Sequence, residues 1–252
     1  MRSAIITGVS RGLGAALLDE LRVGGARVLA LGRRFTDAQH AWERAEPQRL
    51  RLRQTDLVHP ASLPNAAELA SFVHDASEVI LIHNAGVVDP VGAIGAMPAE
   101  QILNAVAINL SAPILLTNAL LGAGVIRPSG HPAGSAGRPL TVLFISSGAA
   151  HRVIGGWSVY SAAKRGAEAF FDALAAQYAE DERVRVVNVN PGVMDTDMQA
   201  GLRDYANRNV YFPDRERFVG LHTSGQLAQP ADIARRIVAE YLPATAANLT
   251  RG

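Results

Sequence analysis

The segment Thr7–Gly14 constrains the fold of this chain most, because it joins a short apolar strand to a helix through three closely spaced glycines. Glycine lets the backbone approach a pyrophosphate, and the free N–H groups at a helix start favour an anion. The spacing Gly-x-x-x-Gly-x-Gly differs from the commoner Gly-x-Gly-x-x-Gly, and an ordinary tight turn is the alternative interpretation. Its position directly after the first strand, Ala4-Ile5-Ile6, favours a dinucleotide-binding loop.

Strand and helix patterns alternate along the rest of the chain. We expect further strands at 27–31, 50–54, 79–82, 141–145 and 184–189, and helices at 36–45, 64–74, 97–121, 160–177 and 230–242. With 252 residues, 48% of them hydrophobic, the chain can bury one large core. The pattern predicts a single α/β domain with a doubly wound, Rossmann-type parallel sheet flanked by helices on both faces.

Three segments lack a clear period. Residues 197–228 hold scattered aromatic side chains and weak periodicity, which is typical of a mobile lid over a substrate. Residues 122–139 are rich in glycine, proline and serine and are expected to form a surface loop. Residues 244–252 form at most a short edge strand.

Composition excludes several classes of function. The chain has no cysteine, and its seven histidines have no metal-ligand spacing, so no metal site is expected. The net charge of +1, with acids dispersed among the arginines, predicts neither a nucleic-acid nor a membrane partner. Residues 102–126 carry no charge, but polar residues and a proline interrupt them, which favours a buried helix over a membrane span. The absence of cysteine and of a signal peptide fits a cytoplasmic protein.

Tyr160 and Lys164 lie one turn apart on the expected helix 160–177 and so face the same ligand. A phenol titrates near pH ~10, and an adjacent ammonium favours the phenolate, which suits acid–base work. Lys164 is the only lysine in the chain. Chance on a surface helix is the alternative, because Tyr-x-x-x-Lys alone is a weak pattern. Ser146 and Ser147 follow the strand 141–145, at the strand end where open parallel sheets bind ligands.

The residues after the second strand indicate which dinucleotide is bound. Arg33 and Arg34 stand where an enzyme that prefers NAD usually has an acid for the ribose. An arginine suits the 2′-phosphate of NADP, and Arg11 is a second candidate from the glycine loop. The alternative is that the two arginines only solvate a loop. Asp56 and Leu57, after the third strand, are candidates for the adenine.

Two further features contain asparagine. Asn84-Ala85-Gly86 follows the buried strand 79–82 and allows close backbone approach. Asn109 lies within an apolar helix, where its amide needs a partner. A functional water and a backbone partner are equally consistent with the sequence.

Together these motifs resemble the short-chain dehydrogenase/reductase family across nearly the whole chain. The motifs, in this order and spacing, are Thr7–Gly14, Asn84-Ala85-Gly86, Asn109, Ser147, Tyr160-x-x-x-Lys164 and Pro191-Gly192. The resemblance implies that Tyr160 protonates a carbonyl oxygen, that Ser147 hydrogen-bonds that oxygen, and that Lys164 holds the nicotinamide ribose. It also implies that Asn109 fixes a water and that Thr196 binds the carboxamide. The expected NADP(H)-binding residues are Gly8, Ser10, Arg11, Gly12, Leu13, Gly14, Arg33, Asp56, Leu57, Asn84, Ala85, Gly86, Tyr160, Lys164, Pro191, Gly192, Val193 and Thr196.

Within the family, Gly156-Trp157-x-x-Tyr160 and the segment 191–199 resemble bacterial benzil reductases and sepiapterin reductases. Sepiapterin reductases anchor the pteridine with an aspartate near the C-terminus, and this chain has no acid after Glu240. The expected substrate is therefore a small apolar or aromatic ketone or diketone rather than a pteridine.

Two alternatives remain open. One is a 3-oxoacyl-carrier-protein reductase, for which the arginines at 203, 208, 215 and 217 would form a docking surface, although acids alternate with them. The other is a non-catalytic protein that senses NADP(H).

The resemblance also implies a homodimer or homotetramer formed by the helices that carry Asn109 and Tyr160. Their apolar side chains were expected to leave a contiguous patch on a monomer. The residues of this patch are Leu110, Ile114, Leu120, Phe170, Phe171, Leu174 and Tyr178.

Overall fold

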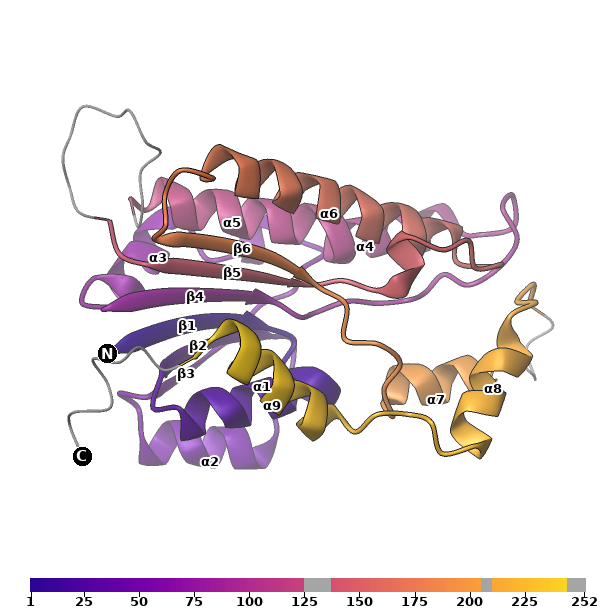
Figure 1. Ribbon diagram of the computed structural model, residues 1–252, viewed down its shortest axis with the longest axis horizontal. Helices are drawn as coiled ribbons and strands as arrows, with labels where there is room; N and C mark the ends of the chain where they lie inside the picture. Colours follow the sequence, from indigo (N-terminus) through magenta and orange to yellow (C-terminus); the bar gives the residue numbers. More distant parts are fainter. Residues whose placement is uncertain (125–136, 205–209, 244–252) are drawn as a thin grey trace.

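A parallel sheet of six strands forms the centre of the part of the chain that this computed structural model describes, residues 1–124, 137–204 and 210–243 (Figure 1). The strands are β1 (Arg2–Thr7), β2 (Arg27–Gly32), β3 (Leu50–Gln54), β4 (Glu78–His83), β5 (Leu140–Ile145) and β6 (Val184–Val189). Their order is β3-β2-β1-β4-β5-β6, and every pair is parallel. The order reverses between β1 and β4, so ligands are expected at their carboxyl ends. The predicted fold class is confirmed.

Helices cover both faces of the sheet (Figure 1). One face is covered by α1 (Gly12–Val23), α2 (Asp37–Ala45) and α9 (Pro230–Tyr241), and the other by α3 (Ala66–Val73), α4 (Ala99–Val106), α5 (Ala112–Gly122) and α6 (Ser158–Gln177). Successive strand residues point to opposite faces. Ile6 accordingly packs in the cluster that contains Leu17 of α1, whereas Ile5 packs in the one that contains Phe171 of α6.

The helix expected at 97–121 forms, but it is not uniform. A π-helical segment, Ala107–Ser111, separates α4 from α5 and contains Asn109. Such segments widen one turn of a helix and are frequent at functional sites. The run Ala99–Gly122 has the length and composition of a membrane span, yet Leu116 and Leu120 pack in the core beneath it, as they do in a helix that covers a sheet.

Two helices form in the segment expected to be a lid, α7 (Asp197–Asp204) and α8 (Arg215–Thr223). They lie beyond the carboxyl ends of the strands (Figure 1). Phe212 and Phe218 stack with Trp157, which precedes α6, in a third cluster that also contains Tyr160. The weak periodicity arises because these short helices bury only a few side chains each. Most of the loop 122–139, and all of residues 244–252, lie outside the described residues.

The expected apolar patch on the Asn109 and Tyr160 helices is largely wrong. Phe171, Leu174, Tyr178 and Leu120 are buried in the core beneath α5 and α6. Helical spacing shows which residues share a face, but it does not show whether that face meets the sheet or the solvent. On the run Ala99–Gly122, which carries Asn109, the exposed large apolar side chains are Leu103 and Leu115.

Candidate active site

Helix α6 presents Tyr160 and Lys164 to the end of β5. The alanines between and after these residues favour a helix, and their small side chains let α6 lie close to the sheet. Tyr160 is 7% exposed and Lys164 is 3% exposed. The only lysine of the chain is therefore buried beside the predicted proton donor.

Ser147 and Tyr160 both line the cavity, and the Ser147 hydroxyl is close enough to the Tyr160 phenol to act on its pKa. Burial raises the pKa of Tyr160, and the neighbouring Ser147 hydroxyl opposes that rise. We expected the charge of Lys164 to lower this pKa, and the expected direction is wrong. The Lys164 Nζ atom lies 5.9 Å from the centroid of the Tyr160 ring and donates instead to the Ile145 carbonyl oxygen, at 2.7 Å.

The pKa of Lys164 is lower than that of an ordinary lysine. Burial lowers its pKa to about 8, and the carboxylate of Glu168, one turn further along α6, acts in the opposite direction. An ammonium that loses its proton near this pH is only partly charged in mildly alkaline solution.

Asn109 is fully buried, and its amide is satisfied by the backbone of one residue. Its Oδ1 atom accepts from the Val87 N–H at 3.1 Å, and its Nδ2 atom donates to the Val87 carbonyl at 2.8 Å. A Cβ atom on Gly86 would lie 3.0 Å from Asn109 Oδ1 and 3.4 Å from Lys164 Nζ. Of the two partners that the sequence left open, the structure shows the backbone.

Gly8 and Gly14 of the glycine loop are packed too tightly to carry a side chain. Gly8 has a φ of 76°, and a Cβ atom on it would lie 2.9 Å from Ala85 Cα. A Cβ atom on Gly14 would lie 2.0 Å from the Gly8 carbonyl oxygen. The Asn84 side chain donates to the Thr7 and Gly8 carbonyls at 3.1 and 3.0 Å, which ties the end of β4 to the loop after β1.

The first turn of α1 fits an anion. Its N-cap residue, Arg11, makes no side-chain capping hydrogen bond, so no side chain caps the N–H groups at the helix start. Gly12, at the helix start, has a φ of 55° and faces Thr196 across the loop. These features form the kind of backbone cradle that a pyrophosphate requires.

A single cavity of about 740 Å³ brings the predicted site residues together. Its lining includes Ser147, Tyr160, Lys164 and every predicted cofactor-binding residue, namely Gly8, Ser10, Arg11, Gly12, Leu13, Gly14, Arg33, Asp56, Leu57, Asn84, Ala85, Gly86, Pro191, Gly192, Val193 and Thr196. Asn109 is the exception. It lies behind the wall and reaches the cavity through Gly86 and Val87.

Sequence reasoning missed the wall near α7 and α8. Ile154, Trp157, Leu202 and Phe218 line the cavity there, together with the exposed Arg152 and Arg217. These residues come from segments with no shared motif, and they meet only because the aromatic side chains of the third cluster stack. The available signals were the scattered aromatic residues of the lid, the motif that contains Trp157, and Arg217 among the arginines of the lid.

The opposite end of the cavity carries positive charge. Arg33 and Arg34 are exposed after β2, and neither guanidinium has an ion pair within the described ranges. Arg11, in contrast, pairs with Asp197 of α7 at 3.0 Å, with both side chains mostly exposed. Exposed pairs of this kind contribute little free energy, so Arg11 remains able to change partner.

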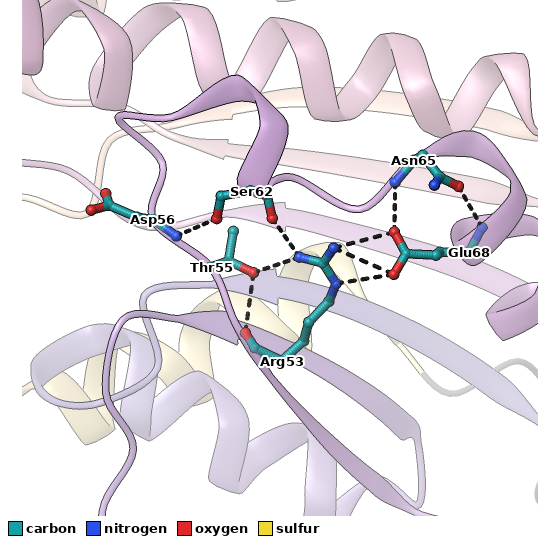
Figure 2. Close-up of polar contacts among 6 residues, drawn as sticks. All are labelled: Arg53, Thr55, Asp56, Ser62, Asn65 and Glu68. Carbon is teal, nitrogen blue, oxygen red and sulfur yellow. Dashed lines mark hydrogen bonds and ion pairs between the residues drawn. The ribbon is translucent and has the colours of Figure 1, made fainter.

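A polar network fixes the loop after β3 that carries Asp56 (Figure 2). Arg53 donates to Thr55 Oγ1 at 3.0 Å and pairs with Glu68 at 3.2 Å. The Ser62 hydroxyl accepts from the Asp56 N–H at 2.6 Å. The network holds Asp56 at the cavity wall while leaving its carboxylate partly exposed.

Comparisons with known proteins agree with this geometry. Residues 2–207 match the short chain dehydrogenase family. The chain is 33% identical to "Benzil reductase ((S)-benzoin forming)" of Bacillus subtilis, over 93% of this chain and 90% of that protein. It is 28% identical to the sepiapterin reductase of Meriones unguiculatus, over 93% and 88% of the two chains. The crystal structure of the KRED1-Pglu enzyme superposes with a TM-score of 0.77 and 26% identity, covering 99% of this chain and 98% of that one. The chain therefore belongs to the short-chain dehydrogenase family, whose members are oxidoreductases that bind nicotinamide cofactors.

Proposed function

We propose that this protein uses NADPH to reduce the carbonyl group of a small apolar or aromatic ketone or diketone. The observation that carries the proposal is that Ser147, Tyr160 and the buried Lys164 line one cavity with the glycine loop. The similarity to benzil reductase supports the same reaction class.

Each of the three active-site residues has its own role in the proposed reduction. When bound, the nicotinamide supplies the hydride that adds to the carbonyl carbon. Tyr160 donates a proton to the carbonyl oxygen, and Ser147 hydrogen-bonds that oxygen as negative charge develops on it. Donors held in place for a developing alkoxide stabilise the transition state more than the ground state. Lys164 holds the ribose and supplies positive charge near the reacting groups.

The choice of NADPH over NADH rests on the end of β2. Arg33 and Arg34 lie in the cavity wall with no acidic partner in the described chain, and no acid stands beside them in the sequence. A 2′-phosphate would supply the missing counter-charge through charge-assisted hydrogen bonds. A ribose hydroxyl alone would leave both guanidinium groups unpaired.

The proposed substrate class rests on the wall that sequence reasoning missed. Ile154, Trp157, Leu202 and Phe218 give this end of the cavity an apolar and aromatic surface beside Tyr160. Aromatic rings stack favourably against such walls, which suits an aryl ketone.

The test is a panel of neutral ketones and diketones, including benzil, assayed with NADPH and with NADH. We expect oxidation of NADPH with aryl diketones and a weaker rate with NADH. Tight NADPH binding without turnover of any carbonyl compound would instead support the alternative of a cofactor-sensing protein.

One observation favours a second candidate, the reduction of a 3-oxoacyl thioester on an acidic carrier protein. Arg152 and Arg217 line the cavity beside the apolar wall, and neither has an ion pair among residues 1–124, 137–204 and 210–243. A comparison of an acetoacetyl carrier protein with the acetoacetyl thioester of N-acetylcysteamine separates the candidates. A strong preference for the carrier protein over both the small thioester and benzil would favour this second function.

A further inference from the structure

Three consecutive residues at the end of β5 each contact a different side chain of α6. The Ile145 carbonyl accepts from Lys164, the Ser146 hydroxyl donates to Glu168 Oε1, and the Ser147 hydroxyl neighbours the Tyr160 phenol and acts on its pKa. The α6 partners, at positions 160, 164 and 168, are spaced four residues apart and therefore lie on one side of the helix. Two of these contacts belong to the proposed chemistry, and the one with Glu168 has no assigned role.

Glu168 is an unusual residue to find there. Its residue exposure is 7%, and a buried carboxylate is costly unless hydrogen bonds and charges compensate it. Both of its oxygens have partners: Oε1 accepts from Ser146, and Oε2 lies 2.7 Å from Nε2 of His151, a residue exposed to solvent in the turn after β5. The carboxylate thus connects the active-site strand end to the protein surface.

Through Ser146, Glu168 affects the positions of the neighbouring active-site residues. Ser146 lies in the chain between the residue that holds Lys164 and the residue that holds Tyr160. Fixing its hydroxyl therefore fixes the backbone from which the Ile145 carbonyl and the Ser147 side chain project. The negative charge of Glu168 also favours the charged form of Lys164, against the effect of burial.

Resting on the proposed function, we propose that Glu168 is a positioning residue: it holds Ser147 and the Ile145 carbonyl in register with Tyr160 and Lys164, and it places a buried negative charge one helical turn from the Lys164 ammonium.

The groups that face Glu168 come from four elements. His151 approaches from the turn after β5, and Ser146 is the residue that directly follows β5. Lys164 lies one turn before Glu168 on α6, and Asp172 lies one turn after it, hydrogen-bonded at 2.7 Å to Asn188 of β6. Asn188 also donates to the Glu168 backbone carbonyl at 3.4 Å. Among these groups, Lys164 and Glu168 form the oppositely charged pair nearest to the reacting groups.

The chain offers a direct measurement, because Lys164 is its only lysine. Protein labelled with ¹³Cε,¹⁵Nζ-lysine reports the titration of this one ammonium by NMR, without any substrate. In Glu168→Gln, which keeps the shape of the side chain and removes its charge, we expect Lys164 to titrate at lower pH than in the wild type. Asp172→Asn makes the same chemical change one turn away, on an exposed side chain, and is expected to leave the titration unchanged.

A second variant tests the positioning role separately. Ser146→Ala removes the hydrogen bond to Glu168 and keeps the charge, so we expect kcat with benzil and NADPH to fall while the Lys164 titration stays close to that of the wild type. An unchanged titration in Glu168→Gln would overturn the electrostatic part of the proposal, and a wild-type kcat in Ser146→Ala would overturn the positioning part. A wild type that turns over no carbonyl compound would contradict the proposed function instead, and the NMR titration would still decide the role of the Glu168 charge.

Discussion

The half-buried Ser147 hydroxyl acts on the phenol of Tyr160, a side chain that is itself almost completely buried. A phenol in such a place keeps its proton, because burial raises its pKa while Ser147 only partly opposes the rise. The protonated phenol is the form that the reduction of a carbonyl needs. The pair is therefore set for proton donation rather than for proton removal at neutral pH.

Tyr160→Phe is expected to abolish carbonyl reduction and to leave NADPH binding nearly intact, because the change removes the proton donor and keeps the ring in its cluster with Trp157. Steady-state turnover and the fluorescence titration of NADPH measure the two properties. Near-normal turnover in the variant would exclude Tyr160 as the proton donor.

Ser147→Ala is the matched change in the residue beside Tyr160. One lost oxyanion donor typically lowers kcat by about 10²–10³-fold, and a similar loss is expected here. A defect confined to cofactor affinity would contradict the role given to this hydroxyl.

Arg33→Asp is expected to weaken NADPH binding and to spare or improve NADH binding, because it replaces a charge partner of the 2′-phosphate with a repelling charge. The measurement is the ratio of the two dissociation constants within one protein, so a general loss of stability cancels. An unchanged ratio would mean that Arg33 only solvates its loop, and Arg34 and Arg11 would become the next residues to test.

The Lys164 pKa of about 8 predicts opposite pH trends for activity and stability. Carbonyl reduction is expected to fall as the pH rises through about 8, because the ammonium loses its charge. Burial holds this pKa below its unfolded value, so the unfolded chain binds more protons between the two values, and the contribution of Lys164 to stability rises with pH in that window.

The matched variant for this prediction is Lys164→Met. Urea unfolding of the wild type and the variant from pH 7 to pH 10 isolates the contribution of the lysine, and the stability difference between them should change in favour of the wild type as the pH rises. A difference independent of pH would show that Lys164 titrates outside this range.

Light scattering at micromolar concentration is expected to give twice or four times the chain mass of 26.7 kDa. The prediction rests on the exposed side chains of Leu103 and Leu115, which are 68% and 40% exposed on the run that carries Asn109. Leu103→Arg should favour the monomer. A fully active wild-type monomer would contradict the predicted assembly.

The sheet could be predicted from the sequence, because β1, β2, β4 and β5 contain short apolar runs and β3 and β6 alternate apolar with polar residues. Gly8 and Gly14 could be identified from their spacing, and the structure shows the contacts that require them. The direction of the Tyr160 pKa shift was beyond the sequence, because it depends on how much solvent reaches the phenol. Spacing placed Lys164 beside Tyr160, but it could not show that Nζ points to the Ile145 carbonyl.

The walls of the cavity near α7 and α8 were also beyond sequence reasoning. Trp157 and Phe218 are 61 positions apart, and only tertiary packing brings their rings to a centroid distance of 5.0 Å. Phe171 was assigned to an interface from its helical spacing, but the structure buries it in the core. Spacing alone does not show which side of a helix faces the sheet.

The spacing of 2.0 Å between a Cβ atom on Gly14 and the Gly8 carbonyl oxygen has a consequence for engineering this protein. Substitutions of Gly8 or Gly14 would prevent the loop from closing, whereas positions 33 and 34 are exposed and already carry long side chains. A change of coenzyme is therefore best sought by mutating the loop after β2, with the glycines left as an invariant frame.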